Sequence, residues 1–272
     1  MKKIAFISGA NRGIGLETAK RLGETGVNVI IGSRDLDKGI KAADSLIAKG
    51  IKAEAIQYDA LDPKAPEKVF NYINDKYKKL DILINNAGVA LSQNVEGMDR
   101  QDFEWVLNIN FWGVVNGCEA FLPQLRQQKD AHIVNISSIF GLCSQPSQSA
   151  YNASKFAVRG FTEALRQELD IENAPVSVTC VHPGGIKTNI AKAAKMNDSI
   201  KSIGLNPSTS TQNFEKLFRT TPAEAANVIL KAVQKDSRRA LIGSDAYVVD
   251  AMQRLLPTGY QKIVALSTKM MG

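Results

Sequence analysis

The chain has 272 residues, a length at which an α/β fold commonly forms one domain around one core. Hydrophobic residues make up 44%, charged residues 22% and aromatic residues 7%, a composition that excludes disordered and fibrous proteins. The formal net charge is +7, and its excess lies in the last third: residues 1–186 carry 21 basic and 21 acidic side chains, whereas residues 187–272 carry 13 and 6. We interpret this basic third as a solvated face.

Secreted, membrane and metal-binding proteins have sequence signals that this chain lacks. The apolar run at 4–7 is too short for a signal peptide, and no segment approaches the roughly 20 apolar residues of a membrane-spanning helix. The cysteines stand far apart and there are only two histidines, so neither a disulfide framework nor a metal site is expected from Cys118, Cys143, Cys180, His132 and His182. The sequence predicts a soluble cytoplasmic protein with no metal and no membrane partner.

Seven short runs of β-branched or apolar residues alternate with stretches long enough for a helix. The runs lie at 3–8, 27–32, 52–57, 81–85, 131–137, 176–181 and 239–243. Apolar residues at three- and four-residue spacing predict helices between them, at 13–23, 36–49, 66–78, 102–125 and 150–169. Such alternation is typical of a parallel sheet. We therefore predict one α/β domain over 1–272, a doubly wound Rossmann fold of about seven parallel strands with helices on both faces.

The first run leads into a glycine turn at 8–15, SGANRGIG, and then into an amphipathic helix. Glycines at a strand's carboxyl end let backbone N–H groups approach a pyrophosphate, which then lies at the positive end of the helix. The same glycines also suit an ordinary turn, but their position at the end of the first strand favours a nucleotide. The candidate residues of this turn are Gly9, Asn11, Arg12, Gly13, Ile14 and Gly15.

The second run ends in Ser33 and Arg34, near the point where an acidic residue would bind the adenosine ribose of NAD. The planar guanidinium of an arginine matches the oxygens of a 2′-phosphate. Arg12 in the glycine turn adds a second cation. The two arginines favour NADP(H) over NAD(H), although both also suit a solvated surface.

The helix predicted at 150–169 carries Tyr151 and Lys155, which are four residues apart and therefore project from one face. We expect the Lys155 ammonium to favour the phenolate and so to lower the pKa of Tyr151. Ser138 follows the run at 131–137, at the predicted carboxyl edge of the sheet. Its hydroxyl is suited to holding a substrate oxygen beside the tyrosine, or else to capping the strand end.

Two segments of the last third lie outside the regular alternation. Residues 187–220 are polar, and loops of this length inside a compact domain are usually functional, so we predict a mobile substrate lid. Across residues 187–201, where Asp198 is the only acidic residue, four lysines are expected to attract an anionic substrate: Lys187, Lys192, Lys195 and Lys201. Residues 246–272 are more apolar and either cover the site or pack on a second subunit; the sequence leaves both alternatives open.

Taken together, four motifs resemble the short-chain dehydrogenase/reductase family in order and spacing, over about residues 3–190. They are Gly9-x3-Gly13-x-Gly15, the NNAG run at 85–88, Ser138 and Tyr151-x3-Lys155. Motifs that agree in order are more specific than any one alone. The resemblance implies a single-domain dinucleotide-binding fold in which Tyr151 is the general acid or base, Lys155 binds the nicotinamide ribose and Ser138 binds the substrate oxygen.

The resemblance also implies further site residues. Asn110 matches the fourth catalytic position, where an amide holds a water that links the lysine to a proton relay. The coenzyme is expected to contact Asp59, Ala60, Asn86, Ala87, Gly88, Pro183, Gly184, Ile186 and Thr188. Ser8 and Ala60 depart from the commoner threonine and valine, and neither change affects catalysis. The helices at 102–125 and 151–169 resemble those through which family members form homodimers or homotetramers.

These observations predict an NADP(H)-dependent oxidoreductase of the carbonyl reductase type. It would transfer hydride reversibly between the nicotinamide and a small carbonyl or secondary alcohol, with Tyr151 as general acid or base. The alternative is a catalytically silent NADP(H)-binding sensor. Nucleic acid is not an expected partner, because the basic last third lacks a recognition helix or an aromatic stacking platform.

Overall fold

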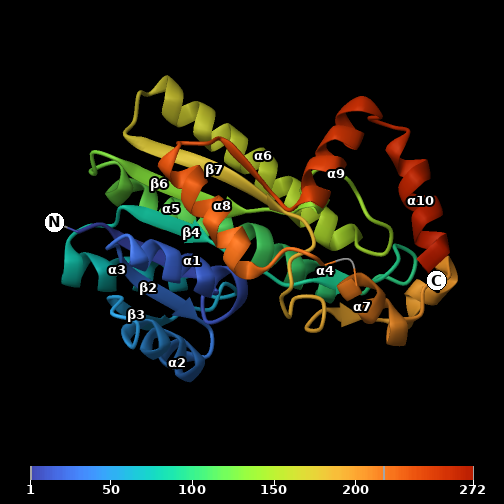
Figure 1. The fold of residues 1–272 in the computed structure, drawn as a ribbon, viewed down its shortest axis with the longest axis horizontal. Coiled ribbons are helices and arrows are strands. Elements are labelled where there is room, and N and C mark those ends of the chain that lie inside the picture. Colours follow the sequence, from blue (N-terminus) through green and yellow to red (C-terminus); the bar gives the residue numbers. More distant parts are fainter. Residues whose placement is uncertain (1, 217, 272) are drawn as a thin grey trace.

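The computed structural model describes residues 2–216 and 218–271, and its centre is a seven-stranded parallel sheet with the strand order β3-β2-β1-β4-β6-β7-β9. The strands are β1 (Ile4–Ser8), β2 (Asn28–Ser33), β3 (Ala53–Gln57), β4 (Ile82–Asn85), β6 (Ala131–Ile136), β7 (Val176–Pro183) and β9 (Arg239–Ile242). The order reverses between β1 and β4, which opens a crevice at their carboxyl ends. The predicted doubly wound Rossmann fold is confirmed (Figure 1).

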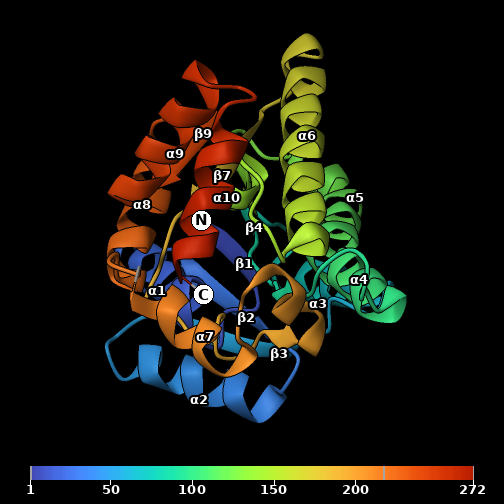
Figure 2. The same cartoon turned by 90° about the vertical axis from the view of Figure 1, so that its right-hand side faces the viewer.

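Three helices cover each face of the sheet and enclose two apolar cores. One face holds α1 (Gly13–Glu24), α2 (Leu36–Ile47) and α8 (Pro222–Gln234), whereas the other holds α3 (Ala65–Tyr77), α5 (Gly113–Leu125) and α6 (Ser149–Ile171). Each helix buries a stripe of apolar residues, as Val158, Leu165 and Leu169 do in α6. The sheet is therefore covered on both sides, and ligands reach it at the carboxyl ends of its strands (Figure 2).

The prediction of one unbroken helix over 102–125 is wrong. The chain forms α4 (Arg100–Leu107), a π-helical turn (Asn108–Trp112) and then α5. The Asn110 side chain in this turn hydrogen-bonds with both backbone groups of Val89, on the loop after β4. A π turn adds one residue without disturbing the apolar pattern on either side, so periodicity did not reveal it.

The packing of α3 on its face of the sheet leads to a stability prediction. Ile73 is 0% exposed in that core, whereas Ile171 at the end of α6 is 81% exposed. Ile73→Val is expected to lower the free energy of unfolding in urea by about 1 kcal/mol, because it removes a buried methylene and leaves a cavity. Ile171→Val, the same chemical change, is expected to cost less than about 0.5 kcal/mol. Equal losses would contradict the packing of α3.

The segment predicted as a lid, 187–220, contains regular structure instead of a featureless loop. It holds β8 (Lys195–Met196), a 3₁₀ turn (Asp198–Ile203) and α7 (Pro207–Lys216), and β8 pairs with β5 (Leu91–Ser92) in a second, two-stranded sheet. The segment thereby closes against the loop that follows β4.

The C-terminal helices α9 (Ser244–Leu255) and α10 (Tyr260–Met271) stand beyond the carboxyl ends of the main strands (Figure 1). The backbone N–H of Ser144 donates to the Tyr260 hydroxyl (3.3 Å), and Gln145 Nε2 donates to Thr268 Oγ1 (3.1 Å). α10 therefore packs on the loop between β6 and α6. No helix in the described ranges is both long and apolar enough to cross a bilayer.

Candidate active site

A cleft of about 610 Å³ lies at the carboxyl ends of the strands and brings most of the sequence-predicted residues together. Those that line it are Gly9, Asn11, Arg12, Gly13, Ile14, Arg34, Asp59, Ala60, Asn86, Ala87, Gly88, Ser138, Tyr151, Lys155, Pro183, Gly184, Ile186 and Thr188. Gly15 and Asn110 are absent from the lining, because each lies behind it.

The glycine turn lies close to neighbouring backbone and adopts positive φ at two of its glycines. Gly9 has φ +64°, and a Cβ there would lie 2.8 Å from the Cα of Ala87; Gly13 has φ +60°. Gly15 lies beneath the turn, where a Cβ would meet Asn86 Nδ2 at 2.6 Å. α1 begins immediately afterwards, and its N-cap residue Arg12 makes no capping hydrogen bond. The first-turn N–H groups of α1 thus remain available to an anion, which fits the pyrophosphate of a dinucleotide.

Ser8 ties the glycine turn to the NNAG loop. Its hydroxyl accepts hydrogen bonds from the backbone N–H groups of Asn86 (3.0 Å) and Ala87 (3.1 Å). The Asn86 side chain returns the contact by donating to the carbonyl oxygens of Ser8 and Gly9. These contacts need the serine hydroxyl, so the departure from threonine keeps the group that the turn uses.

One rim of the cleft is basic. The Arg12 and Arg34 side chains are exposed there, and neither side chain forms a hydrogen bond or ion pair with another residue in the part of the chain that the structure describes. Lys38, in the first turn of α2, lines the same rim and was missed by the sequence analysis. Its ammonium lies 2.7 Å from Asp35, the N-cap of α2. Two unpaired guanidinium groups and one paired ammonium therefore border the cleft beside the end of β2.

Tyr151 lies on the buried face of α6 and is 9% exposed. Burial raises the pKa of its hydroxyl to about 12, and the nearby Ser138 hydroxyl opposes the rise. The expectation that Lys155 lowers this pKa is wrong here, because desolvation of the phenolate outweighs the other effects. The Tyr151 hydroxyl is consequently protonated at neutral pH.

Ser138 has the capping role considered from the sequence, and its contact with a substrate oxygen stays a prediction. Its hydroxyl caps the 3₁₀ turn Ile139–Gly141 by accepting from the Phe140 N–H (3.1 Å), and it lies near enough to Tyr151 to lower the pKa of that residue's hydroxyl. Nδ1 of His182, a residue of β7 that is 0% exposed, lies 2.9 Å from the Ser138 carbonyl oxygen. Since burial lowers the pKa of His182 to about 4, its ring is neutral and holds the serine backbone as an N–H donor.

Lys155 reaches the same end of the cleft from the next turn of α6. Its Nζ donates to the Ile136 carbonyl (2.9 Å) and lies 5.7 Å from the centre of the Tyr151 ring. Burial lowers its pKa to about 8. The side chain is therefore mostly cationic at neutral pH and loses its proton within the range of ordinary assays.

Asn110 is 0% exposed and makes no direct contact with the cleft. Its Oδ1 accepts from the Val89 N–H (2.8 Å), while its Nδ2 donates to the Val89 carbonyl (2.9 Å) and to Ser154 Oγ (3.1 Å). The side-chain amide thus fixes the loop after β4, and its part in a water relay stays a prediction.

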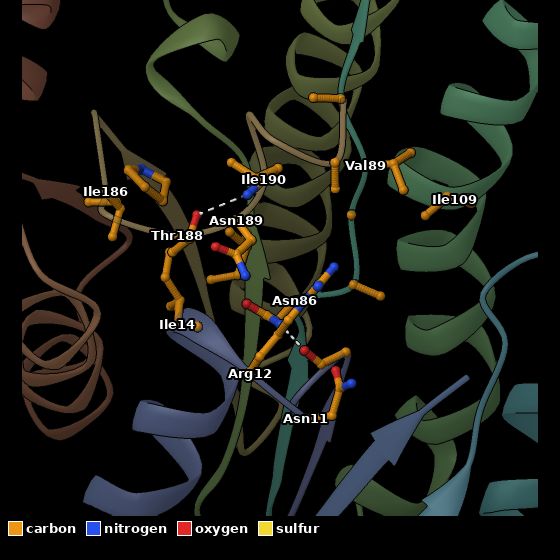
Figure 3. Close-up of a pocket in the computed structure, with 18 of the residues that line it drawn as sticks. Asn11, Arg12, Ile14, Asn86, Val89, Ile109, Ile186, Thr188, Asn189 and Ile190 are labelled. Carbon is orange, nitrogen blue, oxygen red and sulfur yellow. Dashed lines mark hydrogen bonds between the residues drawn. The ribbon is translucent and has the colours of Figure 1, made fainter. Parts of the chain in front are cut away.

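Polar and apolar side chains both line the cleft, as Figure 3 shows. Arg12 and Asn86 lie at one end, whereas Val89 and Ile190 approach from opposite sides at the other. Single apolar residues carry little sequence signal, so the sequence did not reveal most of the apolar residues that line the cleft. The lining residues beyond the predicted set are Ser33, Asp35, Lys38, Tyr58, Val89, Ala90, Ile109, Ile136, Ser137, Lys187, Asn189, Ile190, Ala193, Phe218 and Pro222.

The comparison with known families agrees with this geometry. A family model for short chain dehydrogenases matches residues 3–199, which contain the glycine turn, the NNAG loop, Ser138, Tyr151 and Lys155. The chain belongs to the short-chain dehydrogenase family.

Relatives of this short-chain dehydrogenase are oxidoreductases. The putative oxidoreductase SadH of Mycobacterium tuberculosis is 40% identical over 264 residues, 97% of this chain and 94% of the relative. The NADP-dependent (R)-specific alcohol dehydrogenase of Lentilactobacillus kefiri is 34% identical over 187 residues, 68% of this chain and 74% of that protein. A short chain dehydrogenase/reductase from Burkholderia phymatum, solved in complex with NAD, matches with TM-score 0.86 and 25% identity, covering 93% of each chain. The protein is therefore an oxidoreductase with the fold of this family.

The lid of this short-chain dehydrogenase does not present four free lysines. Lys195 lies 2.5 Å from Asp102 and 4.3 Å from the centre of the Trp105 ring, and Lys201 lies 2.8 Å from Asp198. Asp102 is 93 residues distant from Lys195, so the pairing was invisible in the sequence. Lys195 and Lys201 thus hold the segment to α4 and to itself, whereas Lys187 lines the cleft.

Proposed function

We propose that this short-chain dehydrogenase is an NADP(H)-dependent reductase of ketones or aldehydes, with Tyr151 as the general acid. The observation that carries the proposal is the group formed by Ser138, Tyr151 and Lys155 at the inner end of a cleft whose outer rim is basic. A protonated phenol beside a serine hydroxyl is suited to protonating an alkoxide as it forms.

The dinucleotide would lie across the carboxyl ends of the strands, held by the residues of the cleft. The glycine turn and the first-turn N–H groups of α1 would hold the pyrophosphate, and Asp59 with the NNAG loop would hold the adenosine. Arg12 and Arg34 would hold a 2′-phosphate, for which both guanidinium groups are unpaired within the described ranges. A relative named as NADP-dependent and a solved neighbour bound to NAD support the coenzyme class, and the arginines support NADP(H).

When bound, NADPH supplies the hydride that reduces the carbonyl carbon. Ser138 and Tyr151 hydrogen-bond with the carbonyl oxygen, and Tyr151 gives it a proton as its charge develops. The Lys155 ammonium, 5.7 Å from the Tyr151 ring, stabilises the phenolate that remains. Oxidation of an alcohol uses the same residues in reverse, but the protonated state of Tyr151 at neutral pH favours reduction.

Assembly and access are part of the same proposal. Residues 187–220 would act as the substrate lid of a single-domain enzyme, and the chain would form a cytoplasmic homodimer or homotetramer through α4, α5 and α6. Trp112 and Phe156 support this assembly, since they are 51% and 38% exposed beside those helices. Light scattering coupled to size-exclusion chromatography tests the assembly, and a monomer would contradict it.

The activity is tested by following NADPH and NADH oxidation against ketones, aldehydes, diketones and acyl thioesters. Turnover with NADPH supports the proposal and identifies the substrate class. Tight NADP(H) binding without turnover of any of these compounds would favour the sensor instead, for which a poised proton donor has no use.

The pKa of Lys155, lowered to about 8, leads to a prediction about pH. As pH rises through 8 the ammonium loses its proton, whereas Tyr151, with a pKa raised to about 12, keeps its own. kcat/KM for reduction is therefore expected to be flat below about pH 7 and to fall about tenfold per pH unit well above pH 8. Lys155→Arg, which stays cationic, should lack this alkaline limb in its residual activity. A wild-type profile that stays flat to pH 10 would contradict the assignment.

A further inference from the structure

Residues 183–188 form the wall of the cleft that carries Ile186 and Thr188, and neighbouring backbone holds this wall on two sides. From β9, the Ile242 carbonyl accepts the N–H of Gly184 (2.9 Å). From the end of the lid, Thr220 donates its N–H to the Gly185 carbonyl (3.3 Å) and accepts the N–H of Lys187 (2.9 Å). One polar group of the wall, the Gly185 N–H, is satisfied by neither neighbour.

That N–H donates to a carboxylate from the C-terminal helices, Asp245 Oδ2, at 2.6 Å. Asp245 lies in the first turn of α9, and it forms no ion pair with any cation in residues 2–216 and 218–271. The backbone around the carboxylate is bare: a Cβ on Gly184 would lie 2.2 Å from Oδ2, and one on Gly243 would lie 2.4 Å from Oδ1. Both glycines therefore make room for this one side chain.

We propose that Asp245 is a positioning residue, which holds the Gly185 peptide so that Ile186 and Thr188 face the nicotinamide end of the cleft. The inference rests on the proposed function, because it takes that end of the cleft as the nicotinamide site. An acidic residue in the first turn of a helix also stabilises that helix. Here, however, the carboxylate is directed at an N–H of another segment, 60 residues earlier in the chain.

The effect of Asp245 is confined to one half of the dinucleotide. The adenosine half would be held by the glycine turn after β1, by Arg34 after β2 and by Asp59 after β3, whereas Asp245 belongs to α9. If Asp245 were lost, the wall at 183–188 would keep its contacts with β9 and Thr220 but lose its third one. Coenzyme affinity should therefore fall, while affinity for the adenosine half alone should not.

The experiment compares Asp245→Ala with Asp250→Ala, a matched change on the same helix whose carboxylate pairs with Arg239 and Arg254 instead. Dissociation constants are measured for NADPH and for 2′,5′-ADP, which lacks the nicotinamide half. Asp245→Ala is expected to weaken NADPH binding about tenfold, the size of one charge-assisted hydrogen bond, and 2′,5′-ADP binding less than about twofold. Asp250→Ala is expected to change neither by more than about twofold.

Asp245→Asn keeps one acceptor oxygen at the same position and is expected to lose only about threefold in NADPH affinity, so the inference is tested even if the alanine variant does not fold. An equal loss of NADPH and 2′,5′-ADP binding would show a general structural role and overturn the inference. Unchanged NADPH binding in both Asp245 variants would also overturn it. If the wild-type protein prefers NADH, the preference for NADP(H) fails while the same comparison, with NADH and ADP-ribose, still tests Asp245.

Discussion

Replacing Tyr151 with phenylalanine is expected to lower kcat for carbonyl reduction by about 10³-fold, because the variant lacks the group that protonates the developing alkoxide. The ring itself remains, so its edge contact with Phe140 (6.2 Å between ring centres) and its position beside Lys155 are kept. Coenzyme affinity is therefore expected to stay within about threefold of wild type. NADPH oxidation at saturating coenzyme gives kcat, and coenzyme fluorescence gives the affinity.

Tyr77→Phe is the matched control for this experiment. Its hydroxyl hydrogen-bonds with Glu54 (2.9 Å), and the residue ends α3, away from the cleft. The control is expected to keep kcat within about twofold. A Tyr151→Phe enzyme that retained more than about a tenth of wild-type kcat would remove Tyr151 as the general acid.

Loss of both unpaired arginines at the rim is expected to abolish the preference for NADPH. In the variant Arg12→Ala/Arg34→Ala, the ratio of kcat/KM for NADPH to that for NADH should fall about 100-fold, since each guanidinium provides charge-assisted hydrogen bonds to a phosphate. The effect should be weaker at high salt, because both side chains are exposed. Initial rates with each coenzyme at two ionic strengths measure it.

Lys38→Ala is the control on the same rim. Its ammonium is already paired with Asp35, so the coenzyme ratio is expected to change less than about fivefold. An equal change in both variants would indicate a general effect of positive charge rather than specific phosphate binding. A wild-type enzyme with no preference for NADPH would contradict the role of the arginines directly.

Most of the architecture follows from signals that are local in the chain. Parallel strands covered on both faces are continuous apolar runs, and the sequence places every strand of the main sheet within two residues of its observed ends. Gly9 and Gly13 mark a turn that needs positive φ, and the four-residue spacing of Tyr151 and Lys155 puts both on one helix face. The two-residue strands β5 and β8 carry no such signal, because they form only where the lid meets the loop after β4.

Long-range contacts and burial decided the features for which the sequence has no local signal. The π turn at Asn110 accompanies the hydrogen bonds of that residue with Val89, and Lys195 forms an ion pair with Asp102. Amino-acid identity sets the ordinary pKa of Tyr151, but desolvation by the surrounding elements raises it to about 12 and keeps the residue protonated. The contact of Asp245 with Gly185 likewise arises only when α9 is folded against β9, which brings it to the segment after β7. Periodicity and motifs thus determine which elements and reactive groups are present, whereas hydrogen bonding and dehydration in the folded chain determine their protonation and their partners.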